Sequence, residues 1–245
     1  MIRTGIVLPT FRDTPDDALD AARQAIAAGV DGLFCYDHIW PIGQPERPAL
    51  APFPLLAALI ASLELPPADG RGPWFGTLVA RVGLVPNAVL IGQFTALEQL
   101  APGRIIAGLG TGDRLSEAEN RAYGIPFASA AERRSDMVEV ARTLRQAGLA
   151  VWLAGGTAGR TVEALAAGAA LNVWAADPAL VAERRRGPGA LEVTWGGPPP
   201  PTPGELRSTL AALHQAGASW AVFGWPIDMV DLVEAARQAG SVPGD

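Results

Sequence analysis

The chain has 245 residues, close to the roughly 250 residues of a single barrel of eight βα units. A hydrophobic fraction of 49% and a charged fraction of 18% exclude a disordered chain, and a net charge of −6 argues against a nucleic-acid or anionic-membrane partner. All 19 basic residues are arginine, which excludes a lysine Schiff base.

Cysteine usage and the start of the chain bear on location. Cys35 is the single cysteine, so an intrachain disulfide is impossible and a cysteine-based metal site is not expected. The segment 1–9 lacks the long apolar core of a signal peptide. No apolar run approaches the ~20 residues that span a bilayer. We expect a cytoplasmic protein with one domain over residues 1–245.

Short apolar strands alternate with alanine-rich helices along the chain. The strands are predicted at 3–8, 32–37, 75–82, 104–109, 150–154, 170–174, 190–195 and 219–224. The helices are predicted at 15–28, 53–63, 88–100, 130–147, 159–167, 178–186, 203–216 and 228–239. Alternating βα units indicate a parallel sheet. Eight units favour an α/β fold closed as a (β/α)8 TIM barrel, with an open doubly wound sheet as the alternative.

Helix ends are marked by particular residues. Thr14 is predicted to cap the first helix, with Pro15 at its first position. Glycines that follow four helices are predicted to be left-handed caps: Gly29, Gly148, Gly168 and Gly217. The longer connections 38–52, 110–129 and 196–202 follow strands, so we expect them over the mouth of the barrel.

The segment 104–113 is the strongest candidate for a functional site, because a strand runs into a glycine-spaced turn that ends in a carboxylate. Gly108, Gly110 and Gly112 would let the backbone approach a flat or anionic ligand, and Asp113 could meet a reacting group. The alternative is an ordinary tight turn. A dinucleotide fingerprint is not supported, because the spacing is G-x-G-x-G rather than G-x-G-x-x-G.

Two further strand ends carry candidate residues. His38 ends the second strand, where it could bind a cofactor or move a proton; the alternative is a structural histidine. Gly155, Gly156 and Thr157 precede a helix whose free N–H groups suit a phosphate, with Arg160 nearby. A plain connecting loop is the alternative there.

Tryptophans and arginines supply weaker signals. Four indoles near one rim could wall a flat ligand, or could simply fill a layer of the barrel: Trp40, Trp174, Trp195 and Trp225. The run Arg184–Arg186 could grip a polyanion, although it is more typical of a solvated helix end. Metal-hydrolase and serine-elbow motifs do not occur in the sequence.

Together these segments resemble the bacterial luciferase-like monooxygenase family, and within it the oxidoreductases that use coenzyme F420. The resemblance covers most of the chain. It is strongest from Gly76-Thr-Leu-Val79 through Arg104–Asp113, and Tyr36-Asp-His38 and Trp152–Gly156 lie in the expected order around this segment.

The resemblance implies roles for individual residues. His38 matches the histidine beside the deazaflavin ring, and Leu78-Val79 matches a bulge that often contains a non-prolyl cis peptide and backs the ring. Thr111 and Gly112, beside Gly110, match cofactor contacts. Asp113 matches an acidic position, which is Glu in the sugar-phosphate enzymes. Gly155, Gly156 and Thr157 match the phosphate-binding turn.

The chain also departs from the family pattern. Asp113 reaches one methylene less far than Glu, and Ile42 stands near the tryptophan of the sugar-phosphate dehydrogenases, which argues against that substrate. Val85 replaces the usual basic residue after the third strand. The short connection from Gly148 to Val151 implies a more open substrate site.

We therefore expect an F420-dependent oxidoreductase that transfers a hydride between the deazaflavin and a small organic substrate. His38 would orient or protonate near the ring, and Asp113 would donate or accept a proton. The alternatives are an FMN-dependent monooxygenase of the same family and a barrel that binds flavin or deazaflavin without catalysis. The resemblance leaves a homodimer open, and no metal is expected.

Overall fold

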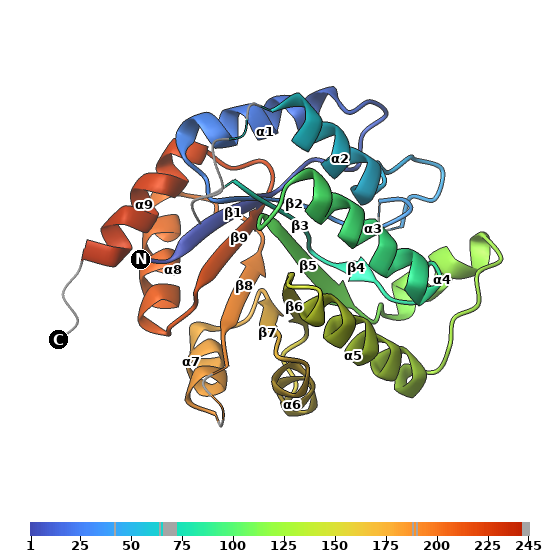
Figure 1. Cartoon of the computed structure of the whole chain (residues 1–245). Coiled ribbons are helices and arrows are strands. Elements are labelled where there is room, and N and C mark those ends of the chain that lie inside the picture. The colour runs from blue at the N-terminus through green and yellow to red at the C-terminus, as the bar shows by residue number, and fades with distance from the viewer. Residues whose placement is uncertain (42, 64, 66–72, 188, 190, 242–245) are drawn as a thin grey trace.

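The computed structural model describes residues 1–41, 43–63, 65, 73–187, 189 and 191–241. Over these residues one parallel sheet closes on itself and is surrounded by helices (Figure 1). Its strands are β1 (Arg3–Val7), β2 (Gly32–Cys35), β3 (Trp74–Thr77), β4 (Ala80–Arg81), β5 (Ile105–Gly110), β6 (Ala150–Ala154), β7 (Ala170–Trp174), β8 (Val193–Gly197) and β9 (Trp220–Gly224).

Closure of the sheet decides between the two predicted architectures. The strand order is β3-β2-β1-β9-β8-β7-β6-β5-β4, and β3 also pairs with β5 through Phe75 and Ile105. The first and last strands lie side by side, with Val7 opposite Gly224. The predicted (β/α)8 barrel is therefore confirmed, and the open sheet is wrong.

The third strand of the barrel is interrupted, where the sequence predicts one strand over 75–82. Leu78 and Val79 separate β3 from β4, and the peptide bond between them is cis, as the family resemblance implies. Beyond the break, β4 pairs with β5 again through Ala80 and Leu109. Thus β3 and β4 share one position of the barrel wall.

The helices cover the outside of the barrel. They are α1 (Asp16–Ala28), α2 (Pro52–Ser62), α3 (Asn87–Leu100), α4 (Arg114–Ala122), α5 (Ala130–Gln146), α6 (Ala158–Ala167), α7 (Pro178–Arg186), α8 (Pro203–Gln215) and α9 (Met229–Ser241). The sequence did not predict α4, which lies within the connection expected to be irregular. This helix is polar and short, so it lacks the apolar stripe that identified the others.

Helix caps follow the predictions with one exception. The four glycines expected as left-handed caps all have positive φ, from 64° at Gly168 to 92° at Gly148. Thr14 does not cap α1: Pro15 is the N-cap residue, and the Thr14 hydroxyl donates instead to Asp16 Oδ2 at 3.0 Å. The helix begins at Asp16, one residue later than predicted, so the N-cap position falls on Pro15 instead of Thr14.

Apolar side chains fill both sides of the barrel wall. Inside the barrel, Phe34 packs on Trp152 at a ring-centroid distance of 5.2 Å and meets Trp220 edge-on at 6.0 Å. A larger cluster lies between the strands and the helices, and there Cys35 is fully buried. Burial raises the pKa of the Cys35 thiol, so this residue is an unreactive packing group.

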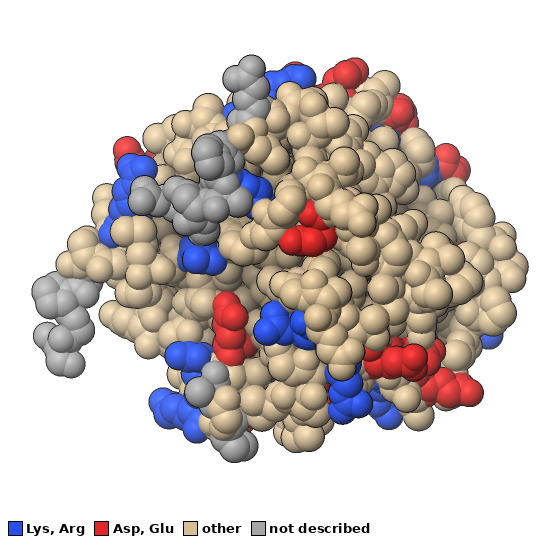
Figure 2. Space-filling model, in the orientation of Figure 1, with Lys and Arg blue, Asp and Glu red and all other residues tan. Residues whose placement is uncertain are grey.

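The surface shows no predominance of one charge on the face drawn in Figure 2, where acidic and basic side chains alternate. Of the helices that the structure describes, none combines the length and apolar character needed to cross a membrane.

Candidate active site at the carboxyl ends of the strands

The parallel strands bring their carboxyl ends to one rim of the barrel, which is where barrel enzymes hold their active sites. His38 follows β2, the Leu78–Val79 bulge follows β3, and Thr111 follows β5. The turn at 155–157 follows β6, which is the neighbour of β5. The structure therefore gathers at one end all the site residues that the sequence predicts. Which of them bind a ligand stays a prediction.

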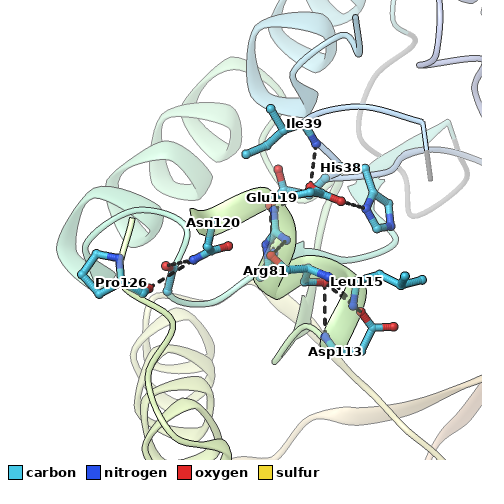
Figure 3. Close-up of polar contacts among 11 residues, drawn as sticks. His38, Ile39, Arg81, Asp113, Leu115, Glu119, Asn120 and Pro126 are labelled. Atoms are coloured by element: carbon cyan, nitrogen blue, oxygen red, sulfur yellow. Dashed lines mark hydrogen bonds and ion pairs between the residues drawn. The ribbon is translucent and has the colours of Figure 1, made fainter. Parts of the chain in front are cut away.

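His38 is held by a carboxylate that the sequence did not single out (Figure 3). His38 Nδ1 lies 2.6 Å from Glu119 Oε1, and the Ile39 amide donates to Glu119 Oε2 at 2.8 Å. The Glu119 side chain, on α4, is only 2% exposed, whereas that of His38 is 27% exposed. Because an ionised carboxylate can only accept, this contact places a proton on Nδ1 and leaves Nε2 as an acceptor.

Arg81 completes the buried cluster. Its Nη2 contacts Glu119 Oε2 at 3.0 Å and its Nη1 donates to the Ser116 carbonyl at the same distance. Burial by itself raises the pKa of Glu119, but hydrogen bonds from His38 and the Ile39 amide, together with the charges of His38 and Arg81, bring it below its ordinary value. Glu119 is therefore ionised at neutral pH, in a buried ion pair with Arg81.

Asp37 lies against the same cluster. Its Oδ2 accepts the Arg81 backbone N–H at 2.8 Å. Burial raises the pKa of Asp37 from 3.8 to about 6, although the Arg81 amide and guanidinium act in the opposite direction. The end of β2 thus carries one carboxylate that resists ionisation, beside a second that is held ionised.

Asp113 has a structural task in this fold. It is the N-cap of α4: its Oδ1 accepts from the Leu115 and Ser116 amides at 2.9 and 3.0 Å, and the Ser116 hydroxyl lies 3.2 Å from the same oxygen. Burial raises the pKa of Asp113, but these hydrogen bonds bring it below its usual value. A carboxylate held in this way is ionised at neutral pH and cannot donate a proton; its predicted role in proton transfer stays a prediction, limited to accepting.

The glycines of the turn after β5 serve contacts within the protein. A Cβ on Gly108 would lie 2.0 Å from the Thr77 carbonyl oxygen, and one on Gly110 would lie 2.5 Å from Val79 Cγ2. Gly112 has a φ of 67°, and its Cβ would meet Arg81 and Ser116. The three glycines therefore make room for the β3 bulge and for Arg81, a reason that the sequence alone did not reveal.

The turn after β6 keeps part of its predicted anion-binding character. Thr157 is the N-cap of α6 and its hydroxyl accepts from the Arg160 amide at 3.2 Å. A Cβ built on Gly159 would meet no other part of the fold within 4 Å, whereas one on Gly155 would lie 3.2 Å from Arg160 Nε and one on Gly156 3.2 Å from Leu180. Arg160 itself pairs with Glu163 at 2.6 Å.

Arginines from the following helices hold both predicted cofactor loops. Arg184 donates through Nε and Nη2 to the Gly156 carbonyl, at 3.2 and 2.9 Å. Arg133 donates through Nε to the Thr111 carbonyl at 2.7 Å. The run Arg184–Arg186 is thus not simply a solvated helix end, since its first member fixes the turn after β6.

The other residues singled out in the sequence lie in different environments in the structure. Trp174 and Trp225 lie at the rim and are 48% and 36% exposed, whereas Trp40 and Trp195 are buried. Val85 packs partly buried against the outer core, and the basic residue of this region is Arg81. Ile42 lies outside the described residues. Among the described residues, no group of three metal-ligating side chains gathers.

Arg81 and Glu119 were missed by sequence reasoning, although each leaves a signal. Arg81 is a charged residue at the end of an otherwise apolar predicted strand, and Glu119 lies in a stretch with no predicted element. A charge in an apolar strand calls for a buried partner, but its identity depends on α4.

Comparison with known proteins agrees with this fold. No family model matches the chain. An F420-dependent glucose-6-phosphate dehydrogenase from Kineococcus radiotolerans is 33% identical over 136 residues, which cover 54% of this chain and 36% of that protein. The chain thus matches well under two thirds of this relative's length.

Solved structures match over nearly the whole chain. The coenzyme F420-dependent tetrahydromethanopterin reductase from Methanopyrus kandleri superposes with a TM-score of 0.64 at 13% identity, over 97% of each chain. The monooxygenase RslO1 from Streptomyces bottropensis gives 0.68 at 14% identity, over 98% of this chain and 97% of that one.

These findings agree with the (β/α)8 barrel of the structure. The chain is related in sequence to F420-dependent dehydrogenases, and its fold is shared by F420-dependent enzymes and by monooxygenases. The resemblance seen in the sequence is confirmed at this level.

Proposed function

We propose that this protein is an F420-dependent oxidoreductase that exchanges a hydride between the deazaflavin and a small organic substrate. The observation that carries the proposal is the fixed orientation of His38 at the barrel rim, after the strand next to the one that ends at the Leu78–Val79 bulge. The sequence relation to an F420-dependent dehydrogenase supports the deazaflavin as the cofactor.

The residues at the rim fit a cofactor with a flat ring and a phosphate. The Leu78–Val79 bulge and His38 Nε2 would contact the ring, and Thr111 would border it. The N-terminus of α6, with Gly155, Gly156 and Thr157 before it and Arg160 beside Gly155, would receive the phosphate. When bound, F420 supplies a carbon that accepts or releases a hydride.

The protein's own groups would orient the reactants and handle the proton. Glu119 holds the His38 ring and its tautomer, so Nε2 can accept a hydrogen bond or a proton from a substrate hydroxyl. Arg81 keeps Glu119 ionised. Asp113 borders the same loop, but its carboxylate accepts hydrogen bonds from backbone amides of α4. We therefore assign Asp113 the role of positioning the loop, in preference to a role in proton transfer. A substrate of small size and the absence of a nucleic-acid partner remain predictions, as does a homodimer.

A titration tests the cofactor assignment. Purified protein should quench F420 fluorescence at micromolar concentrations, and FMN at the same concentrations should bind more weakly by at least tenfold. His38→Ala should weaken F420 binding or slow hydride transfer, with Val89→Ala, at an exposed position of α3, as the control. Preference for FMN would favour the second candidate.

That second candidate is an FMN-dependent monooxygenase. It is favoured by the likeness to RslO1, which covers nearly all of both chains. Oxygen consumption with reduced FMN and a substrate panel distinguishes it from the first. Binding of one cofactor without turnover would instead indicate a non-catalytic binding barrel, and binding of neither would contradict all three functions.

A further inference from the structure

Aromatic side chains form a cluster on the rim, which we call the aromatic rim: Phe11, Tyr36, Trp174 and Trp225. Phe11 stacks on Tyr36 at a centroid distance of 5.9 Å, and Tyr36 meets Trp174 edge-on at 6.1 Å. Arg12 lies over Trp225 at 5.2 Å. These residues come from the carboxyl ends of β1, β2, β7 and β9.

The cluster crosses the mouth of the barrel. In the strand order, β1, β9 and β8 separate β2 from β7, and β3, β5 and β6 separate them in the other direction. Tyr36 and Trp174 therefore come from opposite walls and meet above the interior. His38 borders them, since its ring lies 6.5 Å from Tyr36 and 6.3 Å from Phe11.

Neighbouring residues make room for Trp174 and direct it to this position. A Cβ on Gly196 would lie 2.9 Å from the Trp174 ring and 3.2 Å from Leu78, so the indole and the β3 bulge meet over that glycine. The next residue, Ala175, has a φ of 47°, which alanine rarely adopts. Nevertheless Trp174 remains 48% exposed, so its ring is not there to fill the core.

The chemistry of the aromatic rim selects a particular kind of ligand. Its exposed π faces favour a planar aromatic or conjugated molecule. Two arginines border the cluster: Arg12 is paired with Asp17 at 2.7 Å, and Arg47 reaches the Phe11 carbonyl at 3.4 Å. Burial raises the pKa of Tyr36 to about 12. Its hydroxyl, which has no hydrogen-bond partner among the described residues, is a neutral donor suited to a carbonyl oxygen.

We propose that the aromatic rim is the substrate site, and that the substrate is a planar, conjugated carbonyl compound whose oxygen accepts a hydrogen bond from Tyr36. The inference rests on the proposed function for the position of the cofactor. The mouth is then divided: the glycine-containing loops after β5 and β6 hold the cofactor, the aromatic rim holds the substrate, and His38 lies between them.

Ligand-observed NMR with two matched probes tests this proposal. Coumarin is planar and conjugated, and octahydrocoumarin has the same ring skeleton but is saturated and puckered. We expect coumarin to bind at least tenfold more tightly than octahydrocoumarin. Trp174→Ala should weaken coumarin binding by about tenfold, Trp174→Phe by less than threefold, and Tyr36→Phe severalfold. Tyr123→Ala removes an exposed aromatic ring outside the cluster and should have no effect.

Equal binding of the two probes, or unchanged coumarin binding in both Trp174→Ala and Tyr36→Phe, would overturn the proposal. So would displacement of coumarin by saturating F420, because the cluster would then belong to the cofactor site. The same samples are titrated with F420 by fluorescence. If F420 fails to bind while the coumarin pattern holds, the proposed function fails and the aromatic site stands; the reverse result overturns this inference alone.

Discussion

Arginine side chains brace backbone carbonyls at several loops of this lysine-free chain. Arg133 and Arg184 hold the Thr111 and Gly156 carbonyls at the rim where the strands have their carboxyl ends. At the other end of the barrel, Arg145 and Arg185 donate to the Leu149 and Leu191 carbonyls at 2.8 and 2.9 Å. A planar guanidinium with several donors is suited to this work, and the loops that would hold the cofactor are fixed before it binds.

Glu119 should be required both for stability and for the orientation of His38. Glu119→Gln keeps the shape of the side chain but leaves the buried Arg81 charge uncompensated, so we expect the free energy of unfolding to fall by about 3 kcal/mol. We also expect the His38 imidazole to populate both tautomers, which ¹⁵N chemical shifts report.

Glu119→Asp provides the matched control, since it retains the charge. It should recover part of the stability lost in Glu119→Gln and keep the proton on Nδ1. Unchanged ¹⁵N shifts in Glu119→Gln would show that Glu119 does not set the tautomer.

Asp37 should make the protein less stable as the pH rises from about 4 to about 6. Its pKa of about 6 in the folded protein lies above the ordinary 3.8, so folding favours the protonated form, and this contribution is lost as the pH passes the folded value. Asp37→Asn can still accept from the Arg81 amide and carries no charge. Its free energy of unfolding should therefore match the wild type near pH 4 and exceed it above pH 6.

Urea unfolding of both proteins between pH 4 and 7 checks this. A difference that stays constant over that range would mean that Asp37 ionises normally. The pH range also separates the effect of Asp37 from that of Glu119. The pKa of Glu119 is lowered by folding, so its contribution to the free energy of unfolding is lost as the pH falls through the folded pKa, which lies below the ordinary 4.5.

The sequence predicted which residues lie at the rim, but it did not predict which other residues they contact. His38 and the Leu78–Val79 bulge lie at a strand end as predicted. The glycines of the turn after β5 were assigned to ligand approach, whereas their missing Cβ atoms are required by Thr77 and Val79. Such a contact joins two strands some thirty residues apart, and no local pattern in the chain reveals it.

At the scale of elements, α4 decides the character of the site. It places Glu119 in contact with His38 and Ser116 in contact with Asp113, yet it was the one described helix that the sequence did not predict. Strongly periodic helices such as α1 and α5 were located to within about two residues. A short polar helix is fixed instead by its cap and by the buried ion pair of Glu119, and both are tertiary features.

The N-cap of α4 offers a test of the two roles of Asp113. Asp113→Ala should lower the free energy of unfolding by about 1 kcal/mol, whereas Asp113→Asn should lower it by only a few tenths, because asparagine is an equally good cap. If Asp113 only positions the loop, Asp113→Asn keeps turnover and Asp113→Ala loses part of it through displacement of Glu119.

Chemical denaturation measures the stability of the two variants, and steady-state kinetics measures their turnover. Loss of turnover in Asp113→Asn with stability retained would indicate that Asp113 takes part in proton transfer, since asparagine caps a helix but cannot exchange a proton at neutral pH.

At the scale of the whole molecule, the order of βα units predicted the closed barrel correctly, because parallel strands joined by helices leave few other arrangements. What the order could not predict is how the mouth is divided. Aromatic residues that follow β1, β2, β7 and β9 meet across the mouth, and the loops after β5 and β6 complete its border. Segments from both ends of the chain therefore border the same mouth of the barrel.

Cofactor binding should consequently stabilise the barrel as one unit. A ligand present at a hundred times its Kd stabilises a folded protein by about 2.7 kcal/mol, and for a domain of 150–250 residues each 1 kcal/mol raises Tm by roughly 2–4 °C. We expect F420 at that concentration to raise Tm by roughly 5–10 °C in a single transition, measured by calorimetry. FMN at the same concentration should raise it by less. A larger shift with FMN would contradict the deazaflavin assignment, and two separate transitions would contradict the cooperative closure of β1 on β9.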